Sequence, residues 1–148
     1  MPQVIFKLNN MLYWIGFLIW ESYMNFKKIE NLSAILMIVS FFLPWVSLGI
    51  LSASGFKIAS MGGAGTLLFV IPLLAIVVLA NDMLNFLDVD KSKYLTYLTA
   101  LVPLIYIIFR LIQDAANFFE LSSIGIYLTL IASVLMILGA SGKIKLPE

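Results

Sequence analysis

The sequence predicts an all-α membrane protein, a bundle of four transmembrane helices, on three observations. Apolar residues make up 62% of the 148 residues and charged residues 11%, whereas soluble domains have about 45–50% and about 25%. Most of the chain falls into four stretches of membrane-spanning size. The lysines gather between these stretches. We therefore expect a four-span domain over residues 25–148, preceded by a separate segment, residues 1–24.

Each predicted span is long enough, at about 1.5 Å per residue, to cross about 30 Å of hydrocarbon as a helix. Residues 32–51 and 61–80 contain no charge. The third span, residues 94–112, reaches full length only if the helix continues through Arg110, whose guanidinium would then snorkel to the headgroups. The fourth, residues 121–142, is again uncharged.

The positive-inside rule predicts the orientation of the bundle. Six lysines lie before the first span, between the second and third, or after the fourth, all on one side: Lys27, Lys28, Lys91, Lys93, Lys143 and Lys145. The opposite side has only Lys57 and Arg110. We expect a multi-pass protein of the inner or plasma membrane with both ends of the four-span core in the cytoplasm.

Residues 1–24 carry an apolar run, residues 11–20, that is too short to span a bilayer. Its flanking sequence offers no signal-peptide cleavage site. Its tryptophans and tyrosines favour an interfacial helix at the membrane surface. Two alternatives stay open: an extension upstream of a start at Met24, and a fifth, tilted span over residues 4–24.

The outer loop after the first span begins at Pro44, which predicts that the helix ends or kinks close to Leu43. Trp45 is then expected to anchor the loop at headgroup depth. Residues 46–51, the turn-like residues 52–55 and residues 56–59 read as a short β-hairpin. An irregular loop before a glycine-rich helix start is an equal alternative.

The motifs Leu43-Pro44-Trp45 and Ser54-Gly55-Phe56 resemble the outer loop of small bacterial four-helix membrane proteins with an LPW…SGF pattern. The architecture is also distantly similar to that of claudin-like tetraspans, although the claudin cysteines and Trp-Gly-Leu-Trp motif are missing. The resemblance implies four helices with a β element in the first outer loop. It implies no activity.

Small polar residues predict which helix faces meet, because helices in lipid associate through close packing and a few hydrogen bonds. Two stripes, one in the first span and one in the fourth, are expected to face each other: Ser33, Ser40 and Ser47, and Gly125, Thr129 and Ser133. The functional alternative is that these hydroxyls line a water-filled path.

Ionisable residues are candidates because charge is costly near a bilayer, and none lies in the middle of a predicted span. Arg110 and Asp114 have the spacing of a helical ion pair, and with Glu120 they form an outer mixed-charge cluster. The residues expected to make outer-loop interactions are Pro44, Trp45, Gly55, Phe56, Arg110, Asp114 and Glu120. The acidic residues between the second and third spans are expected to be solvated: Asp82, Asp88 and Asp90.

The composition argues against catalysis. Without histidine or cysteine the chain lacks the usual general base, the thiol nucleophile and the commonest metal ligands. We expect no catalytic residue, cofactor or metal, and a net charge of +1 gives no reason to expect nucleic acid. Two function classes remain, each with the lipid bilayer as environment. The first is an accessory subunit or scaffold that binds a protein partner; the second is a homo-oligomeric pore or membrane-perturbing effector.

Overall fold

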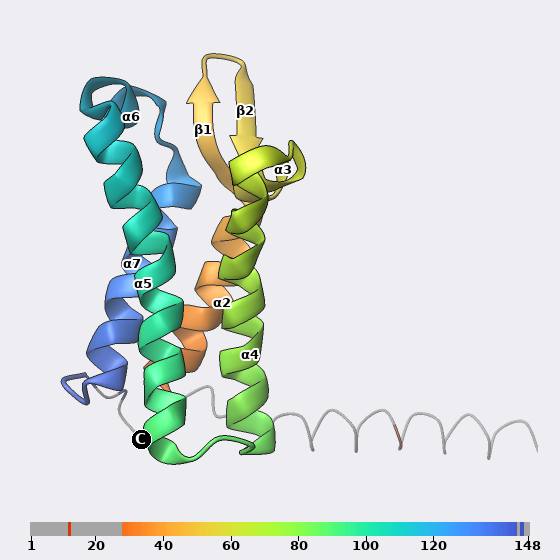
Figure 1. Ribbon diagram of the computed structural model, residues 1–148, viewed down its shortest axis with the longest axis vertical. Helices are drawn as coiled ribbons and strands as arrows, with labels where there is room; N and C mark the ends of the chain where they lie inside the picture. The colour runs from red at the N-terminus through yellow and green to blue at the C-terminus, as the bar shows by residue number, and fades with distance from the viewer. Residues whose placement is uncertain (1–11, 13–27, 145, 147–148) are drawn as a thin grey trace, which may run out of the picture.

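The computed structural model describes residues 12, 28–144 and 146. Four long helical segments run side by side, and a small β-hairpin stands at one end of them (Figure 1). The interfacial helix predicted for residues 1–24 lies, apart from residue 12, outside the described residues.

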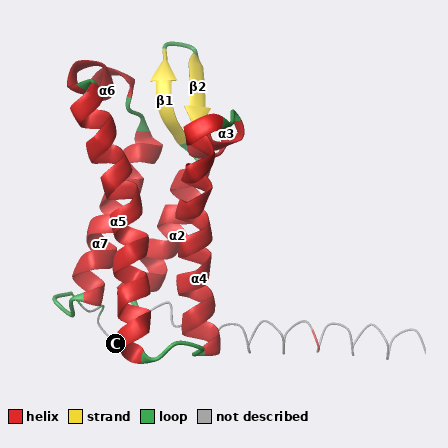
Figure 2. Ribbon diagram, in the orientation of Figure 1, coloured by secondary structure: helices red, strands yellow, loops and turns green. Residues whose placement is uncertain are grey.

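The chain is mostly helical (Figure 2). The long segments are α2 (Ile29–Phe42), η1 (Gly63–Phe69) continued by α4 (Val70–Leu84), α5 (Val89–Gln113) and α7 (Ile124–Ala140). The short elements are β1 (Pro44–Leu48), β2 (Leu51–Ser54), α3 (Gly55–Ser60) and α6 (Ala115–Leu121).

The two ends of the helices differ in character. We call the end that carries β1, β2, α3 and α6 the hairpin end. The opposite end holds the start of α2, the connection between α4 and α5, and the end of α7. We call it the lysine end, because these segments carry Lys28, Lys91, Lys93 and Lys143.

Two of the helical segments are long and apolar enough to cross a membrane, residues 63–84 and 89–113. The other two, α2 with 14 residues and α7 with 17, are apolar but shorter. The expectation of four full-length helical spans is therefore met in length by the second and third segments only.

The first and fourth predicted spans have the wrong bounds. As predicted, α2 ends just before Leu43, because Pro44 lacks an amide hydrogen and disfavours a helical residue before it. The predicted span nevertheless ran on to residue 51, across residues that form strands. At the other end of the chain, α7 begins at Ile124 rather than Leu121, because Leu121 closes the separate helix α6.

The second and third helices are longer than predicted. Helix α4 passes Ala80 and ends at Leu84, where Asn85 adopts the left-handed conformation that favours a helix C-terminus. Helix α5 begins at Val89 rather than Tyr94 and, as expected, continues through Arg110.

The predicted β-hairpin is confirmed, but its turn lies elsewhere. Strands β1 and β2 are antiparallel, and Leu48 pairs with Leu51 across a two-residue loop. Gly49 occupies the first loop position with φ +61, which glycine adopts without strain in tight hairpin turns. The residues expected to form the turn and the second strand instead give β2 and the helix α3. Ser54 caps α3 by accepting a 3.1 Å hydrogen bond from the N–H of Lys57.

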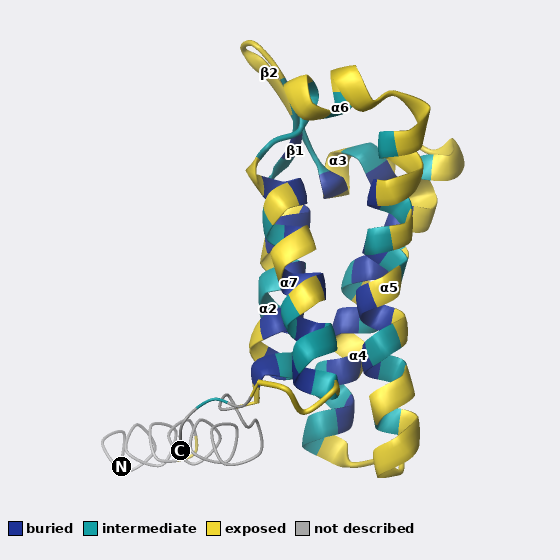
Figure 3. Cartoon of the chain, turned by 90° about the vertical axis from the view of Figure 1, so that its left-hand side faces the viewer, coloured by how far each residue is buried: buried dark blue, intermediate teal, exposed yellow. Residues whose placement is uncertain are grey.

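The core lies where the long helices meet and combines small residues with larger ones, among them Met37, Ile71 and Met136. Helix α2 packs against α4 and α7, and α5 packs against the same two helices. Each of the four helices buries an alanine completely: Ala34, Ala75, Ala100 and Ala132. Other large apolar residues on these helices are exposed, among them Leu73, Ile105 and Ile131. Figure 3 shows exposed and buried stretches alternating along the helices.

Candidate functional site

Trp45 lies inside the molecule at the root of the hairpin and is fully buried. Its indole Nε1 donates a 2.8 Å hydrogen bond to the carbonyl oxygen of Ser40, and its own carbonyl oxygen accepts one of 2.9 Å from the N–H of Ser123. The rings of Phe41 and Tyr106 lie 6.1 and 5.9 Å from the indole, centroid to centroid. Trp45 thus joins α2, α5 and the start of α7. The prediction that it anchors the loop in the headgroup region is wrong, because its indole is buried inside the protein.

Two glycines make room for this packing. A Cβ atom on Gly55 would lie 2.8 Å from Cε2 of Trp45. A Cβ on Gly125 would lie 2.7 Å from the carbonyl oxygen of Pro44 and 2.9 Å from that of Leu43. Gly125, which belongs to the predicted packing stripe, therefore lets the first turn of α7 approach the root of the hairpin directly.

The other outer-loop candidates divide between buried and exposed. Gly55 is buried and offers no surface for a partner, and Pro44 is half-buried. Phe56 is exposed, and its ring stacks on that of Phe42 with a centroid distance of 5.7 Å.

The mixed-charge cluster does not form as predicted, although Arg110, Asp114 and Glu120 are all exposed at the hairpin end. Among the described residues, Arg110 and Asp114 make no ion pair. Helix α5 ends at Gln113, and the Asp114 carboxylate instead accepts hydrogen bonds from the backbone and side-chain nitrogens of Asn117 in the first turn of α6. Asp114 is a helix cap rather than half of an ion pair.

The structure brings Ser40 of α2 and Thr129 of α7 together, with their hydroxyl oxygens 2.7 Å apart and both residues buried. Each hydroxyl also lies 2.8 Å from a carbonyl oxygen of its own helix, Ser40 from that of Met37 and Thr129 from that of Gly125. Two hydroxyl hydrogens serve three close contacts, so one hydroxyl donates across the helix interface while the other donates within its own helix.

The remaining stripe residues behave differently. Ser33 and Ser133 are buried and donate to carbonyl oxygens of their own helices at 2.7 and 2.8 Å. Ser47 lies in β1, because α2 ends before it, and so the prediction that Ser47 continues the helical stripe is wrong.

The Ser40–Thr129 contact predicts a measurable coupling. In a double-mutant cycle of Ser40→Ala and Thr129→Val, followed by denaturant titration of the purified protein, we expect a coupling energy of about 0.6 kcal/mol, the average for such bonds between membrane helices. Ser33→Ala with Thr129→Val is the matched control, because the two side chains share no hydrogen bond and their effects should add. Strict additivity in the Ser40 cycle would contradict the contact.

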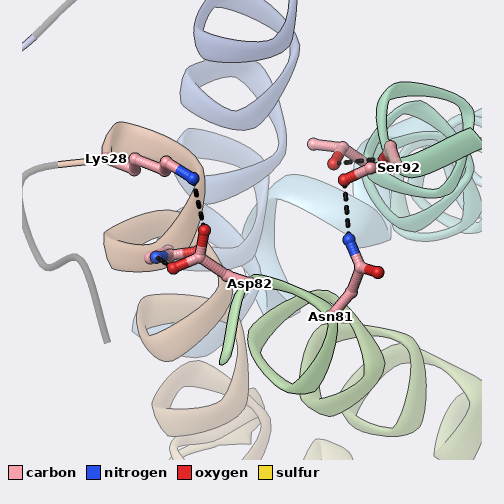
Figure 4. A network of polar contacts seen from close by, with 6 residues as sticks. Lys28, Asn81, Asp82 and Ser92 are labelled. Atoms are coloured by element: carbon pink, nitrogen blue, oxygen red, sulfur yellow. Dashed lines mark hydrogen bonds and ion pairs between the residues drawn. The ribbon is translucent and has the colours of Figure 1, made fainter. Parts of the chain in front are cut away.

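A polar cluster at the lysine end was not anticipated. Lys28 at the start of α2 forms an ion pair with Asp82 near the end of α4 (Figure 4). Asn31, one turn along α2, donates a 2.7 Å hydrogen bond to the same carboxylate. The Asp82 side chain is only 10% exposed and that of Lys28 is 53% exposed. The prediction that Asp82 is a solvated loop charge is therefore wrong, whereas Asp88 and Asp90 are indeed exposed.

Asn81 makes the second half of this cluster. Its Nδ2 donates to the hydroxyl of Ser92 in the first turn of α5 at 2.8 Å (Figure 4). Its Oδ1 accepts from the N–H of Leu87 at 2.9 Å. These bonds fix the tight connection between α4 and α5. They also explain why α4 continues past Ala80, since both polar residues of its last turns have partners inside the protein.

A depression of about 230 Å³ opens beside the polar cluster, between the ends of α2, α4, α5 and α7. Its charged lining residues are Lys28, Glu30, Asp82 and Lys93. Asn31, Ser92 and Thr96 add polar groups, and Val78, Val89 and Ala140 add apolar ones. In the part of the chain that the structure describes, no group of three or more acidic, histidine or cysteine residues gathers as a metal site would require.

The sequence does contain a signal for this cluster. In two consecutive antiparallel helices, the start of the first lies beside the end of the second. Lys28 and Asn31 at the start of α2 therefore have to be considered as partners for Asn81 and Asp82 at the end of α4.

Fold and site together define a small, mostly helical protein with a β-hairpin at one end, a mixed-charge depression at the other, and two helices long enough to cross a membrane. Comparison of the chain with protein-family models, with curated proteins and with solved structures finds no match.

Proposed function

We propose that this chain is a small multi-pass protein of the cell membrane that acts by binding, as an accessory subunit or scaffold of a larger membrane assembly. Its four membrane spans would be α2, η1 with α4, α5 and α7. The support is the large apolar surface of the helices: each helix buries an alanine at its contacts, and many of its large apolar residues are exposed. Helices in lipid pack through small residues, because the lipid solvates the large ones.

The shortness of α2 is compatible with a span because the hairpin root continues it. At about 1.5 Å per residue, α2 covers about 21 Å of the roughly 30 Å of hydrocarbon. Non-helical backbone at membrane depth is tolerated where protein covers it. Trp45 meets this condition, since its side chain is buried and its carbonyl oxygen is bonded to the N–H of Ser123.

The charge distribution supports a cytoplasmic lysine end. Among the described residues it carries four lysines, against Lys57 and Arg110 towards the hairpin end. The positive-inside rule then places the β-hairpin outside the cytoplasm.

The observation that carries the binding role is the apolar tip of the hairpin. Ile50 is fully exposed, and Leu48 and Leu51 beside it are 58% and 69% exposed. The tip projects from the end of the bundle (Figure 1), and its root is fixed by buried Trp45. A rigidly presented apolar tip loses little conformational entropy on association, which favours protein binding. We take the partner to be a larger membrane protein with an apolar groove outside the cytoplasm.

The pore class loses its main support. It requires the serine and threonine stripes to face a lumen between copies, yet Ser33, Ser40, Thr129 and Ser133 are all buried within one chain. Their hydroxyls have partners within the chain, either carbonyl oxygens of their own helices or, between Ser40 and Thr129, each other.

Single cysteines test the proposal cleanly, because the chain has none of its own. In intact cells we expect Ile50→Cys to react with a membrane-impermeant maleimide, and Lys91→Cys to react only after permeabilisation. A photoreactive maleimide on Ile50→Cys should then give one discrete adduct with a different membrane protein. That partner should co-purify with the parent chain in mild detergent and be lost from Ile50→Asp.

The controls distinguish specific binding through the hairpin tip from nonspecific association. Ser52→Asp adds the same charge at an exposed polar position of the same hairpin and should keep the partner. Adducts only between copies of this chain would favour the homo-oligomeric class. Reaction of Lys91→Cys in intact cells, or a partner retained by Ile50→Asp, would overturn the proposal.

A further inference from the structure

The depression at the lysine end presents two opposite charges that no ion pair uses. Lys28 and Asp82 already pair with each other. Among the described residues, Glu30 on α2 and Lys93 on α5 make no ion pair, and both line the depression.

The side chain of Glu30 lies against α7 at Gly139. A Cβ atom on Gly139 would lie 3.0 Å from Cδ and 3.1 Å from Cγ of Glu30, so the stem of Glu30 occupies the space that any larger residue would need. Across the depression, Lys93 lies next to Ser92, whose hydroxyl oxygen accepts from Asn81 and so keeps its own hydrogen for another acceptor. One wall thus offers an acceptor for a cation, and the other offers donors for an anion.

We propose that the depression binds a zwitterionic headgroup with a primary amine, the phosphoethanolamine group of a lipid in the cytoplasmic leaflet. The ammonium group lies at Glu30, and the phosphate lies at Lys93 and the Ser92 hydroxyl. The inference rests on the membrane placement in the proposed function, since that places the start of α2, the end of α4 and the start of α5 at headgroup depth.

Size and chemistry separate this headgroup from the other common ones. A volume of about 230 Å³ is below the range of about 300–1,000 Å³ typical of small-molecule sites, so a headgroup fits better than a larger ligand. Choline cannot donate hydrogen bonds to Glu30, and quaternary ammonium groups are usually bound by aromatic side chains, which the lining lacks. An anionic lipid without an amine would leave Glu30 facing a negative charge.

The test uses the full chain purified in detergent, with added phospholipids that share acyl chains and differ in headgroup. Native mass spectrometry should show the ethanolamine lipid retained about tenfold better than the choline and glycerol lipids, the ratio expected if one charge-assisted hydrogen bond is lost. Free phosphoethanolamine should compete with the lipid, whereas inorganic phosphate should not. Equal retention of the three lipids would overturn the proposal, and so would competition by inorganic phosphate alone.

Variants test the roles of Glu30 and Lys93 in binding the headgroup. Glu30→Gln should remove the preference for the ethanolamine lipid. Lys93→Gln should weaken the retention of all three lipids, because each of them carries the phosphate, whereas Lys91→Gln should change neither retention nor preference. Lys91 is the matched control, since it lies in the same first turn of α5 and is exposed, but it pairs with Asp88 and does not line the depression. Retained preference in Glu30→Gln would exclude the ammonium subsite. Such a failure would leave the cysteine labelling of Ile50 and Lys91 unaffected, so it is distinguishable from failure of the membrane placement.

Discussion

Replacing Trp45 with alanine is expected to lower the free energy of unfolding by about 3–5 kcal/mol, as for other large aromatic side chains in packed interiors. The cavity dominates this cost. The carbonyl oxygen of Ser40 that loses the indole N–H still accepts a bond from the N–H of Leu43 at 3.2 Å, so it is not left unpaired. Trp45→Phe, which fills much of the space without the hydrogen bond, should therefore cost less, about 1–2 kcal/mol.

Denaturant titration of the purified protein in detergent, followed by far-ultraviolet circular dichroism, measures both values. Phe119→Ala is the matched control, because it removes an exposed aromatic ring from α6 and should change the free energy of unfolding by no more than about 0.5 kcal/mol. If Trp45→Ala were no more costly than Phe119→Ala, Trp45 would not be the residue that joins the hairpin root to the bundle.

The position of Trp45 shows what local sequence predicts and where it stops. Pro44 acts on the residues next to it, so the end of α2 was predictable from a few positions. Whether the following tryptophan faces lipid or protein depends on Gly125, eighty residues further along the chain, which leaves the space that the ring and the hairpin root fill. The stripe of small residues predicted that Gly125 faces the first span, but the sequence pattern does not show that the hairpin root packs against it.

The hairpin turn was misplaced for a different reason. Serine and glycine are favoured in turns and also at helix N-termini. Residues 52–55 lead into a helix N-terminus rather than forming a turn, since Ser54 caps α3. The actual turn has a single glycine, Gly49, and its short loop is recognisable only once the pairing of Leu48 with Leu51 is known.

The lysine end was mispredicted because polar residues there were counted as solvent-facing. Asn81 and Asp82 follow an apolar run, which is typical of the end of a span. The partners of Asn81 are Leu87 in the next connection and Ser92 in α5, and those of Asp82 are Lys28 and Asn31, 54 and 51 residues earlier. Lysine counts only predict an orientation of the helices, whereas the pairing of individual polar side chains requires the three-dimensional arrangement.

Gly125 should be the position at which the smallest added group has the largest effect. Glycine to alanine in a helix ordinarily stabilises by about 0.5–1 kcal/mol, because glycine loses more conformational freedom on folding. Here the new Cβ would meet the carbonyl oxygens of Pro44 and Leu43 at 2.7 and 2.9 Å, and these backbone atoms cannot rotate away. We therefore expect the opposite sign for Gly125→Ala, a loss of about 1–3 kcal/mol, with Gly125→Leu at or above the top of that range.

The sign of the Gly125→Ala effect shows whether the helix preference for alanine or the close approach of the carbonyl oxygens is larger. The same denaturant titration measures it. Val134→Ile is the matched control, because it adds one carbon to the exposed face of α7 and should have almost no effect. A Cβ on Gly125 would also meet Cδ1 of Trp45, besides the carbonyl oxygens of Pro44 and Leu43. Combining Gly125→Ala with Trp45→Ala should therefore recover only part of the cost, because removing the indole leaves the two carbonyl oxygens in place. Stabilisation by Gly125→Ala alone would mean that α7 does not pack on the hairpin root at this distance.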